Sequence, residues 1–406
     1  MPHPRASRAS PRGPRWPAFA LGCISALTAP TGCDCLPRPS QAEGTSAACR
    51  LVEDGPGPPG TTAVRVEVVA RGLRVPWGIA FLSERELLVT ERPGRLRLVA
   101  DGQLVDTPVL EVPGSDTAEG GLLDVVLHPA FEDNRLFYLY RTAEADGAPV
   151  NRVEQYRLAE DHRSAARERV ILDGIPAATY HNGGRMRFGP DGMLYVGTGD
   201  AKDPDRSQDP QDPAGKILRV TADGEIPGDN PEDGSPAFIM GVRNTQGFDW
   251  RDDDTLLVSD HGPSGEMMRW GHDEITVARA GDNLGWPDIY GCGAKPGMVS
   301  PSIVWEEAVP PGGAAVYRGT AIDAWRGDLM VASLGARHLH RVAFDQDDPR
   351  VVERHEVYLR NELGRLREAT MGPDGHLYLT TSNCDGRGDC PAEGDAIVRI
   401  VPAESE

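Results

Sequence analysis

Short segments in which a turn leads into a strand-like run recur six times along the chain, and this repetition restricts the fold more than any other feature. Each segment opens with turn-forming residues and continues with a short, mainly apolar run of β-favouring residues. Two of them, GPDGMLYVGT and GPDGHLYLTT, are nearly identical. The six segments are 83–91 (SERELLVTE), 132–140 (EDNRLFYLY), 190–198 (PDGMLYVGT), 252–260 (DDDTLLVSD), 326–334 (RGDLMVASL) and 373–381 (PDGHLYLTT).

The spacing of these segments matches a radial repeat. Successive anchors are about 50, 57, 62, 73 and 48 residues apart, measured between Leu87, Phe137, Leu194, Leu256, Leu329 and Leu377. Such periods are typical of the four-stranded blades of a β-propeller. Further strand-like runs, such as KILRV at 216–220, provide partners within each blade, and no amphipathic helical pattern persists for three turns. The sequence therefore predicts an all-β, six-bladed β-propeller over residues 64–402 and disfavours a two-domain α/β enzyme.

The N-terminal residues predict export. Arginines precede a short apolar stretch at about residues 16–29, which is the pattern of a signal segment and assigns residues 1–33 to it. The stretch is too short to span a bilayer. Gly-Cys pairs end at Cys23 and Cys33, so the alternatives are lipidation at either cysteine or ordinary cleavage nearby. We expect a periplasmic or extracellular protein, lipid-anchored or free, in which residues 34–63, rich in Pro, Gly, Ser and Ala, form a flexible linker.

The charge balance excludes one class of partner. The chain has 42 Lys and Arg residues against 62 Asp and Glu residues, a formal net charge of −20. This sign opposes a phosphate backbone, so we expect no nucleic-acid partner. Excess carboxylates are compatible with calcium, although most solvate the surface.

Export bears on the seven cysteines, because disulfides persist in oxidising compartments. Cys384 and Cys390 bracket the tight loop CDGRGDC and are predicted to form a disulfide. Cys49 and Cys292 are the candidates for a second one. Zinc binding is the disfavoured alternative, since no CxxC pair or second His/Cys cluster accompanies them.

Polar residues that can carry chemistry gather in four loop segments, at 179–200, 241–250, 259–287 and 364–375. Each has an ordinary structural explanation on its own, as a histidine in a glycine-rich turn or an arginine in a surface ion pair. Arg365 and Arg367 are two residues apart, so in a strand both face the same side. Combined on different blades, a histidine, several arginines and a Gly-Pro turn predict a polyanionic cofactor near a cation, with a base above it.

Nine motifs occur in order between Leu73 and Val401, and together they resemble one family. The chain is similar to the soluble PQQ-dependent sugar dehydrogenases, also called aldose sugar dehydrogenases or glucose/sorbosone dehydrogenases. The motifs are VPWGIAFL, LVTERPGRLRLV, GGLLDVVLHPAF, YHNGGRMRFGPDG, PAGKILRV, RNTQG, DHGPSG, GDNLGWP and GRLREATMGPDG.

The resemblance implies a channel mouth that holds pyrroloquinoline quinone (PQQ) and Ca²⁺. His181 falls where the family has its general base, which takes the proton of the C1 hydroxyl of an aldose while the C1 hydride passes to C5 of the quinone and a lactone forms. Glycines beside His181 are expected to give the sugar close access. Gly262 and Pro263 match the residues whose carbonyls bind calcium, and the cofactor contacts implied are Arg243, Asn244, Arg365 and Arg367.

Two departures from the family pattern bear on the site. Glu119 stands where many members have glutamine before Gly-Gly-Leu-Leu, and it is kept as a candidate cofactor contact that needs protonation or a cation nearby. The segment between Pro263 and Asp273 is longer than expected, so no acidic metal ligand, Glu266 included, is assigned there.

Two other functions fit a propeller with these loops. A Ca²⁺-dependent sugar lactonase would use an acidic and amide metal cage instead of a histidine base with an Arg-x-Arg pair. A non-catalytic extracellular binding propeller would not need His181 together with the arginines. The preferred prediction is a PQQ- and Ca²⁺-dependent sugar dehydrogenase whose partners are a small sugar and an electron acceptor, neither of which the sequence specifies.

Overall fold

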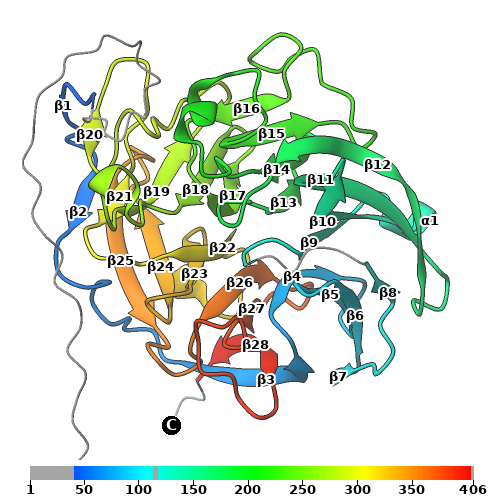
Figure 1. Cartoon of the computed structure of the whole chain (residues 1–406). Helices are drawn as coiled ribbons and strands as arrows, with labels where there is room; N and C mark the ends of the chain where they lie inside the picture. Colours follow the sequence, from blue (N-terminus) through cyan, green and yellow to red (C-terminus); the bar gives the residue numbers. More distant parts are fainter. Residues whose placement is uncertain (1–40, 113–117, 404–406) are drawn as a thin grey trace, which may run out of the picture. The chain divides into compact units, whose positions relative to one another are not determined.

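A computed structural model describes residues 41–112 and 118–403. The residues assigned to the signal segment, including Cys23 and Cys33, lie outside the described residues. In the described chain, six sheets of four or five strands lie around a common axis (Figure 1), and a seventh, two-stranded sheet joins residues 44–45 to residues 293–294. Its helical elements are short: α1 (Phe131–Asn134) and the 3₁₀ turns η1 (Pro204–Gln208), η2 (Glu266–Met268) and η3 (Asp323–Trp325). Within these residues no helix is long and apolar enough to cross a bilayer.

Each of the six larger sheets is one blade, and its first strand lies next to the axis (Figure 1). The predicted six-bladed propeller is therefore confirmed. With strands given in order from the axis, the first blade is β4 (Pro76–Phe81), β5 (Glu86–Glu91), β6 (Arg95–Ala100) and β7 (Gln103–Leu104), with β8 (Leu110–Glu111) also on β6, and the second is β9 (Leu122–Leu127), β10 (Leu136–Ala145), β11 (Ala148–Leu158) and β12 (Ala165–Pro176). The third blade is β13 (Met186–Phe188), β14 (Leu194–Gly197), β15 (Lys216–Val220) and β16 (Ala237–Met240), and the fourth is β17 (Thr245–Asp252), β18 (Thr255–Asp260), β19 (Asp273–Ala278) and β21 (Ile303–Trp305). The fifth blade is β22 (Pro311–Val316), β23 (Leu329–Ser333), β24 (His338–Phe344) and β25 (Val352–Tyr358), and the sixth is β26 (Leu366–Met371), β27 (Leu377–Thr381), β28 (Asp395–Pro402) and β3 (Val64–Leu73).

The last blade joins the two ends of the propeller sequence. Its outermost strand, β3, comes from the start of the domain and pairs antiparallel with β28, from Val64 opposite Pro402 to Leu73 opposite Asp395. This pairing closes the ring and removes the exposed edges that an open array of sheets would have.

The core consists of six apolar clusters in the described residues, and each cluster fills the space between two neighbouring blades. Leu88 and Leu139, for example, meet between the first and second blades. All six sequence anchors lie in second strands and are at most 4% exposed. Burying each such side chain contributes about 1.5–3 kcal/mol, which explains why this position repeats.

The segment expected to be a flexible linker differs from that expectation over its described residues. β1 (Gly44–Thr45) pairs with β20 (Gly293–Ala294), and β2 (Arg50–Val52) adds to β21 as a parallel strand. A disulfide between Cys49 and Cys292 holds this segment to the propeller, and the predicted Cys384–Cys390 disulfide is also present. Strands of two or three residues are too short to show a periodic pattern, which is why the sequence predicted a linker here.

Candidate active site

The predicted site residues meet at the entry ends of the first strands. His181 precedes β13, Asn244 precedes β17, and Glu119 precedes β9. Hydrogen bonds join these loops directly: Glu119 accepts from the backbone N–H of His181 at 3.2 Å, and Asn244 accepts from that of Gly183 at 2.9 Å. Gln246, in β17, accepts from Arg367 of β26 at 2.5 Å. The loops of four blades therefore converge at one end of the ring.

His181 is held in a fixed orientation by a carboxylate. Its Nδ1 lies 2.7 Å from Oδ1 of Asp200, whose other oxygen accepts a hydrogen bond from the indole N–H of Trp286 at 2.9 Å. Because a carboxylate only accepts, the proton of the neutral imidazole lies on Nδ1 and Nε2 is left as the basic atom. The residue is 6% exposed and Asp200 is fully buried. Nε2 lies 3.5 Å from Oε1 of Glu266. A buried imidazole whose orientation is fixed through Nδ1 is the arrangement that a general base requires.

The glycines after His181 serve the packing of the loop. A Cβ on Gly183 would lie 2.5 Å from the Gly197 oxygen and the Thr198 Cα, and one on Gly184 would lie 2.6 Å from Leu123 Cδ1. Both glycines also have positive φ, at 62° and 115°. They let the loop lie against β14 and β9 in a left-handed backbone conformation. That they also give the sugar close access stays a prediction.

Arg243 and Asn244 are fixed through their backbones by Asp260. Its two carboxylate oxygens each accept one of their N–H groups, both at 2.7 Å. Burial raises the pKa of Asp260 to about 7, opposed by these two hydrogen bonds and by the charge of Arg243. The Arg243 side chain is buried, donates to the His261 carbonyl at 3.3 Å and pairs with Glu266 at 2.8 Å. Its Nε has no hydrogen-bond partner.

Arg365 and Arg367 converge on one carboxylate, as their spacing predicts. Arg365 lies 2.9 Å from Oδ2 of Asp385 through Nη2, and Arg367 lies 4.0 Å from the same oxygen. Burial lowers the pKa of Arg367 to about 9, with Arg92 and Arg365 acting in the same direction. Its Nε is buried without a hydrogen-bond partner. Buried guanidinium N–H groups without a hydrogen-bond acceptor suit an anionic ligand.

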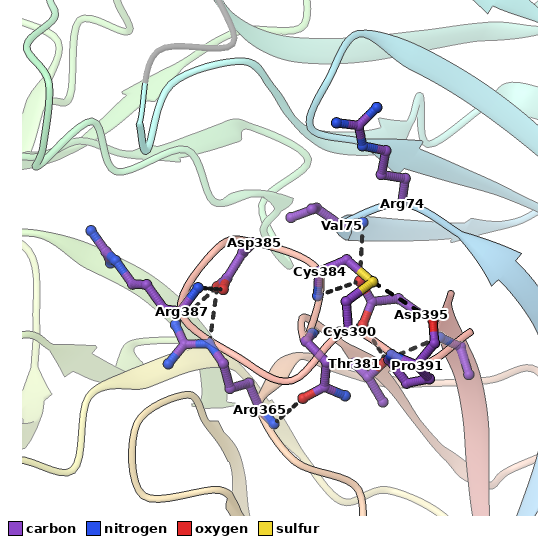
Figure 2. Close-up of a disulfide and its surroundings, with 12 residues drawn as sticks. Arg74, Val75, Arg365, Thr381, Cys384, Asp385, Arg387, Cys390, Pro391 and Asp395 are labelled. Carbon is purple, nitrogen blue, oxygen red and sulfur yellow. Dashed lines mark hydrogen bonds and ion pairs between the residues drawn. A yellow bond between two sulfur atoms is a disulfide. The ribbon is translucent and has the colours of Figure 1, made fainter. Parts of the chain in front are cut away.

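The loop closed by the Cys384–Cys390 disulfide belongs to the site (Figure 2). Asp395 anchors its start by accepting the N–H groups of Asn383 at 2.6 Å and Cys384 at 3.1 Å. From this loop Asp385 reaches Arg365, as Figure 2 shows. Sequence reasoning treated the disulfide as structural only and missed Asp385, although the acid directly after Cys384 was a visible signal.

Glu119 is paired with a cation from the same disulfide loop. Its Oε1 lies 2.9 Å from Nη1 of Arg387, while Oε2 accepts the His181 N–H. Burial raises the pKa of Glu119, but His261, Arg387 and the His181 N–H outweigh it and hold the pKa below its usual value. Arg387 thus supplies a counter-charge to Glu119 within the protein, and the role of Glu119 as a cofactor contact stays a prediction.

Gly262 and Pro263 are buried directly after β18. The N–H of Gly262 donates to Asp273 at 2.9 Å, and a Cβ there would lie 2.0 Å from the Gly271 oxygen, so no other residue fits. Among the described residues, no group of three or more His, Cys, Asp or Glu side chains is arranged to hold a metal ion. The assignment of calcium to the Gly262 and Pro263 carbonyls stays a prediction.

A large cavity of about 590 Å³ lies elsewhere, and none of the predicted site residues lines it. Its lining includes Arg187, Asp249 and Arg318, near the far ends of first strands. The oriented histidine and the arginine Nε atoms without a hydrogen-bond partner lie at the entry ends, which form the candidate active site.

Fold and candidate site together define a class: six-bladed propellers with an oriented histidine and buried arginines at one end of the ring. The sequence matches the Glucose / Sorbosone dehydrogenase family over residues 73–396, and the chain belongs to that family. It is therefore an oxidoreductase that acts on the CH–OH group of a sugar.

Relatives agree with this assignment. The chain is 32% identical to the aldose sugar dehydrogenase YliI of Escherichia coli, over 80% of this chain and 91% of that protein. It is similar to a putative glucose dehydrogenase structure from Thermus thermophilus, with 41% identity, a TM-score of 0.76 and coverage of 83% of this chain and all of that one. The PQQ-bound aldose sugar dehydrogenase of Streptomyces coelicolor has 35% identity, a TM-score of 0.75 and coverage of 85% and 99%.

Proposed function

We propose that this protein oxidises an aldose at C1 to the lactone, with PQQ as the bound oxidant and His181 as the base. The observation that carries the proposal is the His181–Asp200 contact, which leaves Nε2 as the basic atom at the site where the arginines gather. When bound, PQQ supplies a quinone that accepts two electrons as a hydride at C5. The PQQ-bound relative from Streptomyces coelicolor supports this choice of cofactor.

His181 takes the proton of the C1 hydroxyl on Nε2. Asp200 then faces a positively charged ring across 2.7 Å and stabilises it, while Trp286 keeps Asp200 from turning away. Removal of this proton raises the electron density on C1, which makes departure of the C1 hydride easier.

The arginines bind the cofactor's carboxylates and quinone oxygens. Arg243, Arg365 and Arg367 are each at most 7% exposed, so an anion that reaches them is taken out of water. Charge-assisted hydrogen bonds in such surroundings are about twice as strong as neutral ones. Asn244 offers an amide beside Arg243, and Arg387 keeps the charge of Glu119 from opposing the anion.

Calcium is the second component of the proposal. Carbonyl oxygens are ligands that this ion prefers, and Gly262 and Pro263 match the family's metal-binding pair. We expect calorimetry on the cofactor-free protein to show PQQ binding with added Ca²⁺ and a large loss of affinity in excess chelator. PQQ affinity that is unchanged by the chelator would remove calcium from the proposal.

Replacement of the base tests the proposal most directly. His181→Gln should lower kcat by roughly 10²- to 10⁴-fold while PQQ affinity and melting temperature stay near those of the wild type. The measurement is anaerobic stopped-flow reduction of bound PQQ by sugar. His162→Gln, at a partly exposed histidine paired with Glu86, is the matched control and should leave the rate unchanged. Near wild-type PQQ reduction by His181→Gln would exclude His181 as the base.

The family match favours a dehydrogenase over the two alternatives. A lactonase would instead use a metal cage of acidic and amide side chains. A binding propeller has no need for the buried His181–Asp200–Trp286 series. A screen of sugars with a reducible dye, PQQ and Ca²⁺ separates all three functions and identifies the preferred sugar.

We also propose that the protein is exported and works in the periplasm or outside the cell, either anchored through a lipid on Cys23 or Cys33 or free. The two disulfides support an oxidising compartment. Cell fractionation of the native chain and of a Cys23→Ala/Cys33→Ala variant distinguishes the anchored protein from the free one.

A further inference from the structure

One oxygen atom of the protein lies where the proposed reaction needs an oxygen of the substrate. Oε1 of Glu266 is 2.8 Å from Nη2 of Arg243 and 3.5 Å from Nε2 of His181. Nε2 is the atom that takes the proton in the proposed reaction. No step of that reaction uses Glu266.

A reacting C1 hydroxyl has to meet the same two groups. It must reach Nε2 of His181 to give up its proton, and a nearby cation stabilises the negative charge that develops on its oxygen. Arg243 is the cation closest to this point through its contact with Glu266. Two oxygen atoms cannot share one position, so the Glu266 carboxylate and the sugar hydroxyl exclude each other.

The Glu266 carboxylate is charged in this position. Burial raises its pKa, but Arg243 and the N–H of Ser264 outweigh burial and keep the pKa below its usual value. An anion matches the charge that a deprotonating hydroxyl acquires, so the contact resembles the reacting oxygen more closely than a neutral group would.

The segment that carries Glu266 has a strained and exposed tip, although Oε2 of Glu266 accepts the Ser264 N–H within it at 2.6 Å. Residues 264–270, here called the Glu266 loop, are closed at the base by a bridge between Ser264 and Trp270. Met267 and Met268 at the tip have φ of 52° and 57°, a left-handed conformation that costs roughly 1–2 kcal/mol for each non-glycine residue. Met268 and Trp270 are 66% and 63% exposed, so little packing holds the tip in place.

The C-terminal part of the Glu266 loop is anchored to the propeller. Arg269 donates to the Pro287 carbonyl at 3.0 Å, and its guanidinium lies 4.2 Å from the centre of the Tyr290 ring. Movement is therefore expected at the tip, between the bridge and Arg269, with the contacts of Glu266 holding the tip closed.

We propose that Glu266 is an intramolecular competitor of the sugar: its carboxylate fills the position of the reacting hydroxyl and leaves when the sugar enters. This inference rests on the proposed function, because it assigns the same atoms of His181 and Arg243 to the substrate. The Glu266 loop thereby sets the sugar concentration at which the enzyme works.

Kinetics of the PQQ-loaded enzyme test the competition. Glu266→Ala should lower KM for the sugar about tenfold, the effect of losing one charge-assisted hydrogen bond from the competitor, and change kcat less than twofold. Glu266→Gln keeps the size of the side chain and should lower KM by less. Glu232→Ala, at an exposed glutamate, is the control and should change neither constant. A fall in kcat with KM unchanged in Glu266→Ala would show a catalytic role and overturn the proposal.

A second measurement needs neither cofactor nor sugar. In cofactor-free Glu266→Ala, added ¹³C-formate should occupy the vacated position and show line broadening in its NMR signal. The wild type and the double variant Glu266→Ala/Arg243→Ala should show none. If the formate signal broadened equally with the wild type and with Glu266→Ala, Glu266 would not fill the position, even if the enzyme oxidises sugar. If instead the loaded wild type oxidises no sugar, the proposed function fails while the formate result still decides the placement of Glu266.

Discussion

Two loops bring a carboxylate to an arginine of the site, and they are built in opposite ways. The loop between Cys384 and Cys390 is closed by a disulfide and tied to Asp395, and the side chain of Asp385 is 2% exposed. The Glu266 loop has no disulfide, carries two left-handed methionines at its tip, and leaves the Glu266 side chain 29% exposed.

The difference shows how one kind of contact can serve two purposes. Asp385 lies closer to Arg365 than to Arg367, so it fixes the direction of the Arg365 side chain. Its one negative charge only partly neutralises the two arginines, and an anion can therefore still bind Arg367. Glu266 pairs with Arg243 through a strained and poorly packed segment, so its contact can be exchanged for another. A permanent carboxylate orients the site, and an exchangeable one regulates access to it.

The largest expected difference between the two loops is in stability. Asp385→Ala should lower the free energy of unfolding by about 3–5 kcal/mol, because it leaves buried guanidinium groups without their counter-charge. Glu266→Ala should change it by less than about 1 kcal/mol, as expected for a partly exposed pair on a loose loop. Urea unfolding measures both. Asp389→Ala, in the same disulfide loop but 97% exposed, is the control and should have no effect. If Asp385→Ala and Glu266→Ala lowered the free energy of unfolding equally, the proposed difference between the two loops would be wrong.

Opening the disulfide should have a smaller effect. Cys384→Ser/Cys390→Ser removes a bond that spans six residues, which in chain-entropy terms costs about 2 kcal/mol of stability. We expect PQQ affinity to weaken as well, because Asp385 loses the support that orients Arg365. Cys49→Ser/Cys292→Ser removes the other disulfide and should leave PQQ affinity unchanged, since neither cysteine contacts the site. Calorimetry with PQQ on both variants checks the contrast.

The smallest expected effect is that of pH. The pKa values of Asp385 and Glu266 are both below their usual values, because the charges of Arg365 and Arg243 outweigh burial. Their contributions to stability are therefore fully present above about pH 4.5 and are lost only as the pH falls through the lowered values. The ratio of KM between wild type and Glu266→Ala should stay constant from pH 8 to pH 5. A ratio that declines within this range would show that Glu266 takes up a proton there.

The blades could be predicted because their signal is local. The turn and the second strand of each blade are adjacent in sequence, and all six anchors fall in second strands. His181, Arg243, Asn244 and Arg365 each precede a strand that faces the axis, and Arg367 lies at the start of one. Their loops could be selected from the sequence, and the family resemblance implied their roles.

The remaining contacts depend on distant partners that one sequence does not reveal. Asp200 meets Trp286 across 86 residues, and Glu119 meets Arg387 across 268. The same applies to β2, which adds to a strand about 250 residues further along the chain. Side-chain pairs of this kind are fixed by how the blades pack around the axis, and no periodic pattern encodes them.

The strand that closes the ring also determines when the protein becomes able to work. During synthesis, the first five blades each form from consecutive strands, but β3 waits for its partner β28 until nearly the whole chain has been made. The blade completed by that late pairing carries Arg365 and Arg367 and the disulfide loop. A chain that ends before β28 therefore leaves β3 without its partner and the blade of the arginine pair incomplete.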